Sequence, residues 1–259
     1  MVHNQAEVLD YWNNEEVESM KDKNLVAAEI RLISHQIPEG AKILDAGCGE
    51  GEGTLLYSSI PESVVHAVDF SETRLKKAKE RLAGRANVVL KQVDFLGSYL
   101  LANDYDVIVS QRFLINLMEW ELQQKVLLNL MAMLKPDGKL LMLEGSRQGV
   151  DSLNDFRAAC GLEPIPVRWH NLFFDDVLLT DFMAQHGYPL LGQYGLGDYF
   201  LLTRGVRPAL EAGPYSDCEF DRLAATDRIA HLLGLGVKFS RLKLWVFGKS
   251  ELAARSREV

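Results

Sequence analysis

Residues 43–54 read Ile43-Leu44-Asp45-Ala46-Gly47-Cys48-Gly49-Glu50-Gly51-Glu52-Gly53-Thr54, a short apolar run that enters a glycine-rich bend. The apolar residues at its start predict a buried β-strand. Glycine adopts the positive φ angles that a tight bend requires, and a helix is expected to begin directly after it. The stretch therefore predicts a strand-to-helix turn that binds a cofactor.

The residues of the bend indicate which kind of cofactor. A dinucleotide fingerprint reads G-x-G-x-x-G, and Gly47 and Gly49 fit its first two positions, but Glu52 occupies the third. With Asp45 and Glu50 nearby, the turn would repel a diphosphate where a dinucleotide-binding protein must attract one. A positively charged sulfonium that also carries an ammonium group suits an acidic turn better. The bend therefore favours a sulfonium cofactor over a dinucleotide.

Two later apolar runs also end in carboxylates. Residues 64–68 lead into Asp69-Phe70-Ser71, and residues 87–93 lead into Asp94-Phe95. Asp69 lies at the distance from the bend at which a carboxylate binds both ribose hydroxyls of a cofactor. Ligands of open parallel sheets lie beyond the carboxyl ends of the strands, so these residues are expected to surround one site.

Five motifs in order resemble those of the class I S-adenosylmethionine (SAM) dependent methyltransferases. The resemblance covers the segment from about Ile43 to Gly145. The motifs are Leu44-Asp45-Ala46-Gly47-Cys48-Gly49-Glu50-Gly51, Ala67-Val68-Asp69-Phe70-Ser71, Val93-Asp94-Phe95, Tyr105-Asp106-Val107-Ile108-Val109-Ser110 and Leu134-Lys135-Pro136-Asp137-Gly138-Lys139-Leu140. The family implied is thus a SAM-dependent methyltransferase, with SAM as cofactor.

The resemblance implies a role for each motif in holding SAM. Asp69 would bind the ribose hydroxyls, Asp94 would accept from the adenine amino group, and Phe95 would flank the ring. The N-terminal helix often closes over the cofactor in related enzymes, so Tyr11 and Trp12 on that helix are expected to contact it, with packing of the helix onto the domain as the alternative. The expected cofactor-binding residues are Asp45, Gly47, Cys48, Gly49, Asp69, Phe70, Asp94, Phe95, Ser110, Gln111, Arg112 and Tyr11. No metal is expected, because Asp175-Asp176 lacks a third ligand at suitable spacing.

Strands and helices alternate along the chain, which predicts a doubly wound α/β fold. By the resemblance, the sheet has seven mostly parallel strands in a Rossmann-like class I methyltransferase fold, with N-terminal helices and a C-terminal insertion that forms a cap. Strands are expected at 42–46, 64–68, 87–92, 105–110 and 138–144, and helices at 5–20, 22–36, 53–59, 72–82 and 119–134.

The chain is expected to form a single domain over residues 1–259. Its parts are an N-terminal helical cap (1–40), a SAM-binding core (41–147), and a substrate-side region with the last strands (148–250). A strand region is expected over 188–202, one helix over 217–234, and fraying at 251–259. By the family topology, the last strand at 242–247 is antiparallel beside the fifth, which leaves 204–240 as an excursion over the active site.

Composition agrees with a soluble enzyme of 259 residues, 47% of them hydrophobic. A net charge of -8 and a pI near 5.3 argue against a nucleic-acid partner. No apolar run approaches the roughly 20 residues that span a bilayer, and the N-terminus lacks a leader pattern. The three cysteines, Cys48, Cys160 and Cys218, form no C-x-x-C pair, which favours a reducing cytoplasm. The oligomeric state stays open, with a homodimer as one option.

Three residues are candidates for catalysis. Glu144 ends the fifth strand, at the sheet edge where an acceptor would lie, and a solvated strand end is the alternative. His170 follows an aromatic residue and precedes an apolar run, so we expect it near the cleft with a pKa suited to proton abstraction; a histidine held by backbone hydrogen bonds is the alternative. Arg112 follows the fourth strand and could anchor the SAM carboxylate or an anionic substrate, with a surface ion pair as the alternative.

Residues 143–171 are more weakly similar to methyltransferases of bacterial polysaccharide or other glycan assembly. That similarity implies methyl transfer to a sugar hydroxyl or a phosphate-bearing glycan, and an arginine cluster such as Arg112, Arg147, Arg168 and Arg204 could hold an anion. A catalytically silent subunit that binds a partner chain is one alternative. An aminopropyl transferase is another, although Ser110-Gln111-Arg112 replaces the paired aspartates of the polyamine enzymes near the fourth strand.

Overall fold

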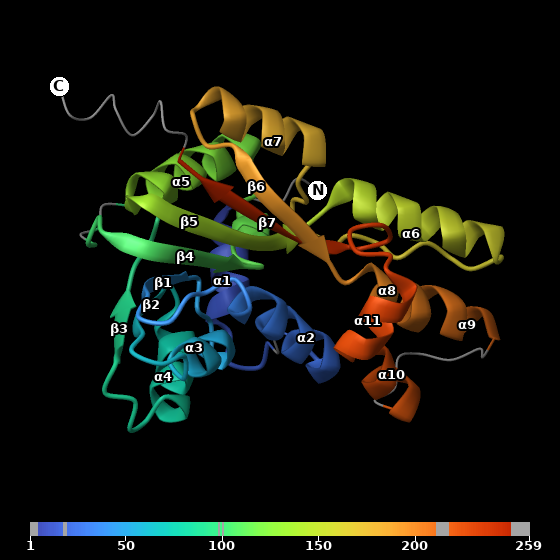
Figure 1. Cartoon of the computed structure of the whole chain (residues 1–259), viewed down its shortest axis with the longest axis horizontal. Helices are drawn as coiled ribbons and strands as arrows, with labels where there is room; N and C mark the ends of the chain where they lie inside the picture. The colour runs from blue at the N-terminus through green and yellow to red at the C-terminus, as the bar shows by residue number, and fades with distance from the viewer. Residues whose placement is uncertain (1–4, 18–19, 98, 100, 211–217, 250–259) are drawn as a thin grey trace.

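The computed structural model describes residues 5–17, 20–97, 99, 101–210 and 218–249, and the tail 251–259 lies outside the described residues. A seven-stranded sheet runs through the molecule in the order β3-β2-β1-β4-β5-β7-β6 (Figure 1). Its strands are β1 (Lys42–Ala46), β2 (Val64–Asp69), β3 (Val88–Gln92), β4 (Tyr105–Gln111), β5 (Leu134–Gly145), β6 (Leu190–Gly195) and β7 (Leu242–Gly248). β7 runs antiparallel to β5 and β6, and the other neighbouring pairs are parallel. The predicted doubly wound α/β fold and the place of the last strand are confirmed.

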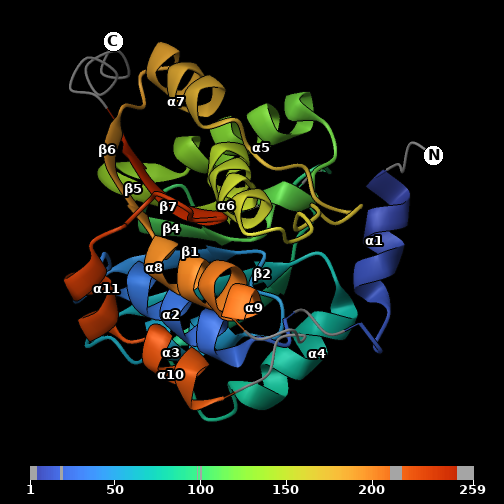
Figure 2. The same cartoon turned by 90° about the vertical axis from the view of Figure 1, so that its right-hand side faces the viewer.

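Helices cover both faces of this sheet, as Figure 2 shows. One face carries α5 (Trp120–Ala132) and α7 (Asp176–Gln185), and the other carries α2 (Lys23–Ser34), α3 (Glu52–Tyr57) and α4 (Glu72–Arg81). Successive side chains of a strand point to opposite faces. Leu44 therefore packs in the core cluster beneath α5, whereas its neighbour Ile43 packs in the cluster beneath α2. No helix in the described ranges is long and apolar enough to cross a bilayer.

Helix α1 (Gln5–Asn13) stands apart from both layers, beside the edge of the sheet where the parallel strands end (Figure 2). It is shorter than the helix expected over 5–20. The side chain of Asn14 accepts a hydrogen bond from the backbone N–H of Glu16 at 2.9 Å. Such a local side-chain bond competes with helical hydrogen bonding, and the helix ends there.

The strand region expected over 188–202 is strand only as far as Gly195. From there the chain enters α8 (Gly197–Phe200), η2 (Leu201–Val206) and α9 (Arg207–Leu210) in succession. A Cβ on Gly197 would lie 1.9 Å from the backbone oxygen of Lys238, so the two chain segments pack backbone against backbone at this position. That close approach turns the chain out of the sheet.

The single helix expected over 217–234 is two helices, α10 (Glu219–Ala224) and α11 (Asp227–Leu233). Thr226 separates them because its backbone is extended, with φ -84° and ψ 143°. Arg31 of α2 donates to the backbone oxygen of Ala225 at 2.6 Å, which fastens this pair of helices along α2.

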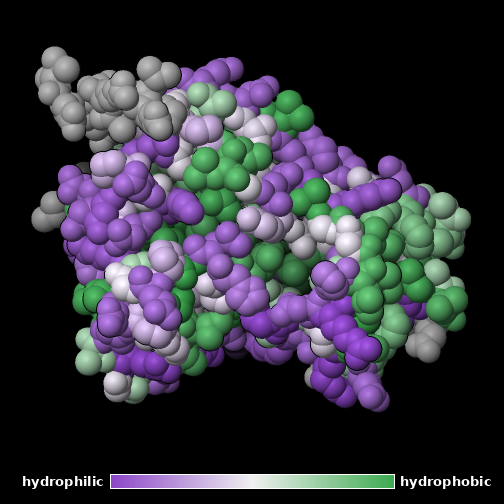
Figure 3. All heavy atoms as spheres, in the orientation of Figure 1, coloured by the Kyte–Doolittle hydropathy of each residue, from purple (hydrophilic) through white to green (hydrophobic). Residues whose placement is uncertain are grey.

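Leu210 of α9 is 80% exposed, and Figure 3 shows apolar surface at the end of the molecule where α9 lies.

The start of helix α6 (Arg147–Ala159) provides a test of the packing at the end of the sheet. Gly149 donates its backbone N–H to the capping Ser146 hydroxyl, and a Cβ at Gly149 would lie 1.8 Å from the backbone oxygen of Ser240. Alanine raises helix propensity by about 1 kcal/mol over glycine. We nevertheless expect Gly149→Ala to lower the free energy of unfolding by about 1–3 kcal/mol, because the clash involves backbone that cannot move aside.

Chemical denaturation of Gly149→Ala measures this change, with Asp151→Ala on the exposed face of the same helix as the control. Unfolding of Gly149→Ala at or above the wild-type denaturant concentration would contradict the packing described here.

Candidate active site

The glycine turn after β1 has the positive φ angles that its sequence predicts. Gly47, Gly49 and Gly51 have φ values of 75°, 54° and 78°, in the region that favours glycine. The backbone N–H groups of Gly47 and Cys48 donate to the Val68 oxygen at 2.8 and 2.9 Å, which ties the turn to the end of β2. A Cβ on Gly47 would lie 2.6 Å from the Cβ of Phe113, so a larger residue would displace that ring.

Asp69 links the turn to the second strand. One carboxylate oxygen accepts the backbone N–H of Gly49 and the other accepts that of Ser71, both at 2.9 Å. Burial raises the pKa of Asp69, while the two amides and Arg74 act in the opposite direction. Neighbouring Asp45 accepts the Thr54 hydroxyl at 2.6 Å, and burial raises its pKa to about 6.

A cavity of about 340 Å³ opens at this edge of the sheet, a size typical of small-molecule sites. It brings together most of the residues expected to bind the cofactor: Asp45, Gly47, Cys48, Gly49, Asp69, Phe70, Asp94, Phe95, Gln111 and Arg112. His170 lines it as well. Ser110, Glu144 and Tyr11 do not. Of the described residues in the expected excursion 204–240, only Arg204 lines the cavity, and no residue of α9, α10 or α11 does.

Glu144 has a different position from the one expected. Its side chain is fully buried and accepts four hydrogen bonds, from the Ser110 hydroxyl at 2.6 Å and from the backbone N–H groups of Phe113, Leu114 and Ile115 at 3.0, 3.0 and 3.2 Å. Burial raises its pKa to about 7, and these hydrogen bonds oppose that shift. The carboxylate holds the segment after β4 in place, and neither Glu144 nor Ser110 lines the cavity, so the structure does not bring these two residues to the place expected for them.

Arg112 lines the cavity, but its charge is already paired. Its φ is 53°, and its Nε lies 3.1 Å from a carboxylate oxygen of Glu29 on α2. Gln111 donates to the same oxygen at 2.7 Å. Burial raises the pKa of Glu29, and Arg112 opposes that shift. Glu29 was missed from the sequence, although a glutamate among Val26, Ile30 and Ile33 on the apolar face of a helix was a signal for a buried ion pair.

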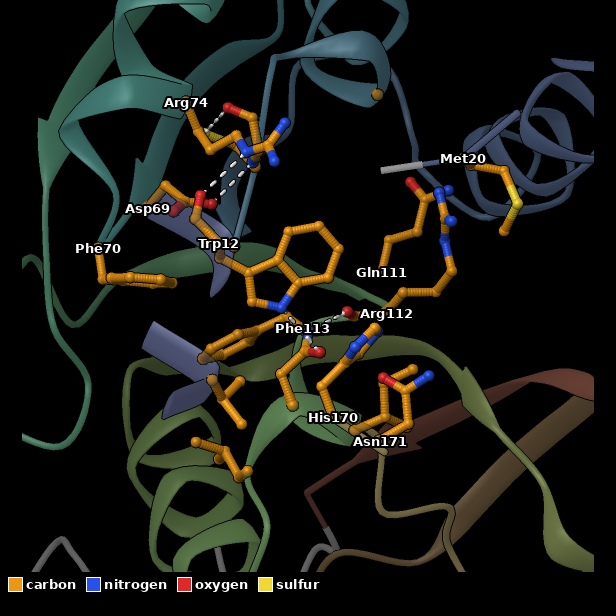
Figure 4. A pocket seen from close by; sticks show the side chains of 18 of the residues that line it. Trp12, Met20, Asp69, Phe70, Arg74, Gln111, Arg112, Phe113, His170 and Asn171 are labelled. Atoms are coloured by element: carbon orange, nitrogen blue, oxygen red, sulfur yellow. Dashed lines mark hydrogen bonds between the residues drawn. The ribbon is translucent and has the colours of Figure 1, made fainter. Parts of the chain in front are cut away.

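Trp12, not Tyr11, is the residue of α1 that enters the cavity. Its indole lies in the middle of the cavity, with Asp69 and Phe70 on one side and His170 on the other (Figure 4). The indole N–H donates to the side chain of Asn116 at 3.1 Å, and the Trp12 backbone oxygen accepts from Arg74 at 3.2 Å. These bonds hold α1 across the cavity between α4 and the segment after β4.

Tyr11 lies outside the cavity because one residue along a helix turns the side chain by about 100°. Its ring stacks on that of His170, with centroids 4.6 Å apart and an angle of 26° between the planes. The expected contact of Tyr11 with the cofactor is therefore replaced by a contact with His170.

His170 comes from the loop between α6 and α7 and is 3% exposed. Its Nδ1 has no hydrogen-bond partner within the described ranges. Burial and the nearby charge of Arg168 lower its pKa to about 4. The expectation of a pKa in the usual histidine range is corrected: the ring is neutral at physiological pH.

Known proteins match this chain over part of its length. Residues 43–138 match the family described as "Methyltransferase domain". Demethylmenaquinone methyltransferase from Staphylococcus carnosus (strain TM300) is 30% identical over 118 residues, which cover 45% of this chain and 48% of that protein. Phosphoethanolamine N-methyltransferase from Plasmodium falciparum (isolate 3D7) is 27% identical over 120 residues, which cover 46% of this chain and 45% of that protein. The matched segment thus spans about half the length of these curated relatives.

Among solved structures, magnesium protoporphyrin IX methyltransferase from Synechocystis PCC 6803 with bound SAH has a TM-score of 0.56. The alignment covers 95% of this chain and 96% of that chain at 14% identity. The similarity in fold therefore covers 95% of this chain, well beyond residues 43–138 of the family match.

The support role of Glu144 can be tested by its neutral isostere. Glu144→Gln turns one acceptor oxygen into an NH2 group that meets backbone or hydroxyl donors. We expect the free energy of unfolding at pH 8 to fall by about 3 kcal/mol, because a hydrogen bond to a charged group contributes about 1.5–3 kcal/mol. Urea denaturation measures the change, and exposed Glu121→Gln on α5 is the control.

Glu144→Gln should also change how the free energy of unfolding depends on pH. The folded pKa of about 7 lies above the ordinary 4.5, so the native protein binds more protons between these values. The contribution of Glu144 to the free energy of unfolding therefore falls as the pH rises from about 4.5 to about 7. Glu144→Gln should remove this part of the dependence of stability on pH. Wild-type stability of Glu144→Gln at every pH would contradict the support role.

Proposed function

We propose that this chain, whose residues 43–138 match the family described as "Methyltransferase domain", is a class I SAM-dependent methyltransferase that transfers the methyl group of SAM to a hydroxyl or phosphate oxygen of a small molecule or glycan. The observation that carries the proposal is the cavity, in which Asp69 lines one side and His170 the other. A cofactor held at Asp69 would place its reactive end towards the acceptor side.

The residues around Asp69 fit the cofactor. Each Asp69 oxygen accepts one backbone amide and retains a lone pair for a ribose hydroxyl. One oxygen of Asp94 accepts the backbone N–H of Leu96 at 2.9 Å, which leaves the other for an adenine amino group. Phe70 and Phe95 supply flat apolar surface beside these carboxylates. Buried Asp45 adds negative charge next to the glycine turn, where a sulfonium and an ammonium group would be stabilised.

When bound, SAM supplies an electrophilic methyl group on a sulfonium that leaves as a neutral thioether. The residues around the cavity would hold the acceptor oxygen in line with that methyl group, and such alignment can contribute roughly 7–11 kcal/mol. Trp12 and the rest of α1 cover the cavity and exclude water. The proton of the acceptor hydroxyl passes to the neutral ring of His170. A weak base suffices, because the hydroxyl proton becomes strongly acidic as the new O–CH3 bond forms.

The named acceptors of the two relatives, demethylmenaquinone and phosphoethanolamine, differ in chemistry, and their identity to this chain covers less than half of it. They support methyl transfer without selecting an acceptor. Oxygen as the methylated atom, a glycan acceptor and a cytoplasmic location stay predictions from the sequence. A silent partner-binding subunit or an aminopropyl transferase would fail the following tests of binding and turnover with SAM.

Asp69 tests the cofactor assignment. We expect the wild type to bind SAM and S-adenosylhomocysteine with micromolar Kd and not to bind NAD. Asp69→Ala removes two charge-assisted bonds of about 1.5–3 kcal/mol each, so its Kd should rise by at least about 100-fold. Isothermal titration calorimetry measures the Kd, a thermal melt checks folding, and exposed Asp137→Ala is the control. Near-native affinity in a folded Asp69→Ala protein would remove Asp69 as the ribose ligand.

His170 tests the proton transfer. His170→Phe preserves a ring that can stack on Tyr11 but has no basic nitrogen, so we expect kcat to fall by about 10²–10⁴-fold with an unchanged Kd for SAM. The exposed His186→Phe is the control. Because the folded pKa is about 4, the His170 contribution to the wild-type rate should be level above about pH 5 and fall only as the pH drops through 4.

Rate measurements from pH 5 to 8 separate the possibilities. An unchanged kcat in folded His170→Phe would leave alignment as the main source of catalysis. A wild-type rate that titrates near pH 6.5, and that loses this titration in His170→Phe, would show that the ring is more exposed to solvent than its burial indicates.

A further inference from the structure

Charge is distributed unevenly around the cavity. Asp45, Asp69 and Asp94 lie at or just beyond the carboxyl ends of β1, β2 and β3, on the side assigned to the cofactor. The lining also includes three arginines from segments connected to the sheet's other half: Arg168 in the loop between α6 and α7, Arg204 in η2 and Arg241 directly before β7. Arg147, which the sequence placed in the same cluster, does not line the cavity. The acceptor side is therefore basic.

Three other charge pairs show which arginines are already neutralised. Arg74 is paired with Glu50 at 2.5 Å, Arg112 with Glu29 at 3.1 Å, and Arg204 with Asp22. In contrast, no carboxylate of residues 5–17, 20–97, 99, 101–210 or 218–249 lies within ion-pair distance of Arg168 or Arg241. Arg168, which is exposed, and the partly buried Arg241 therefore line the cavity without a carboxylate partner among those residues.

The position of Arg241 is held by its neighbours. Its guanidinium lies over the ring of Phe173, 5.3 Å from the centroid, and donates to the backbone oxygen of Pro166 at 3.2 Å. Burial, Arg168 and Arg204 together lower its pKa to about 10, so the three positive groups are close enough to repel one another. Asp22 neutralises Arg204, but Arg168 and Arg241 have no such partner, and an anion bound between them would relieve their repulsion.

We propose that the methyl acceptor carries an oxyanion, a carboxylate or a phosphate, which binds between Arg168 and Arg241 on the His170 side of the cavity. The proposal rests on the proposed methyltransferase function and names the chemistry of its acceptor. Guanidinium groups present a planar fork of N–H donors that matches two oxygens of either anion. Arg168 and His170 are two residues apart in one loop, so the anion would hold the reacting part of the acceptor near His170 and facing the cofactor side.

The test measures anion binding to the full chain saturated with S-adenosylhomocysteine. Inorganic phosphate and acetate are titrated as separate probes, with glycerol as the neutral comparison. The variants are Arg168→Gln, Arg241→Gln and the double variant. Arg147→Gln is the matched control, since it removes the same charge from an exposed arginine just outside the cavity.

We expect phosphate, acetate or both to bind the wild type and Arg147→Gln alike, with the stronger probe identifying the group on the acceptor. The double variant should bind that probe at least about 10-fold more weakly, and its Kd for S-adenosylhomocysteine should stay within about twofold of wild type. No binding of either anion, equal binding by the double variant, or an equal loss in Arg147→Gln would each overturn the proposal.

The two proposals fail separately. If the wild type does not bind S-adenosylhomocysteine, the methyltransferase function fails, and the same titrations on the protein alone still decide whether Arg168 and Arg241 form an oxyanion site. If the cofactor product binds and the arginine variants leave anion binding unchanged, the function stands and the oxyanion site is lost.

Discussion

The buried carboxylate of Glu144 is the interaction on which the arrangement of the site depends. Its hydrogen bonds hold the backbone of Phe113, Leu114 and Ile115, directly after the positive-φ turn at Arg112. Phe113 then packs against Gly47 of the cofactor turn, and Asn116 receives the indole of Trp12. One strand-end carboxylate thus supports both the wall of the cavity and the helix that covers it. Removal of that carboxylate would leave three buried amides and the Ser110 hydroxyl to find other partners.

The two sides of the cavity carry opposite charge, with carboxylates on the cofactor side and arginines on the acceptor side. A cationic cofactor is stabilised by carboxylates, but carboxylates gathered in a buried site repel one another, and burial raises the pKa of both Asp45 and Asp69. Backbone amides of Gly49 and Ser71 offset part of that cost at Asp69. On the other side, Glu29 and Asp22 neutralise Arg112 and Arg204, which leaves the positive charge concentrated at Arg168 and Arg241. The sheet separates these two groups of charges because their segments are connected to different halves of it.

Much of the cofactor side could be predicted from the sequence because it depends on local rules. Glycines specify the bend, and each apolar run shows where its strand ends, so Asp69 and Asp94 could be placed at one edge without knowledge of the packing. The other residues depend on direction or on contacts between distant segments. Glu144 stands at a strand end, yet the alternation that sends Met142 into the core beneath α5 also sends Glu144 to that face. The choice between Tyr11 and Trp12 depends on how α1 is rotated, and that rotation is determined by Asn116, 104 residues from Trp12 in sequence.

The acceptor side shows how binding and chemistry could be joined through one arginine. Two causes lower the pKa of His170, its burial and the positive charge of Arg168. An oxyanion bound at Arg168 would neutralise the second cause, so His170 would be a stronger base with the acceptor in place than without it. His170 is neutral at physiological pH both with and without the bound oxyanion. The oxyanion would therefore raise the proton affinity of the ring without changing the fraction of His170 that is neutral. With Arg168 two residues before His170 in one loop, recognition of the proposed oxyanion would be coupled to removal of the acceptor's proton.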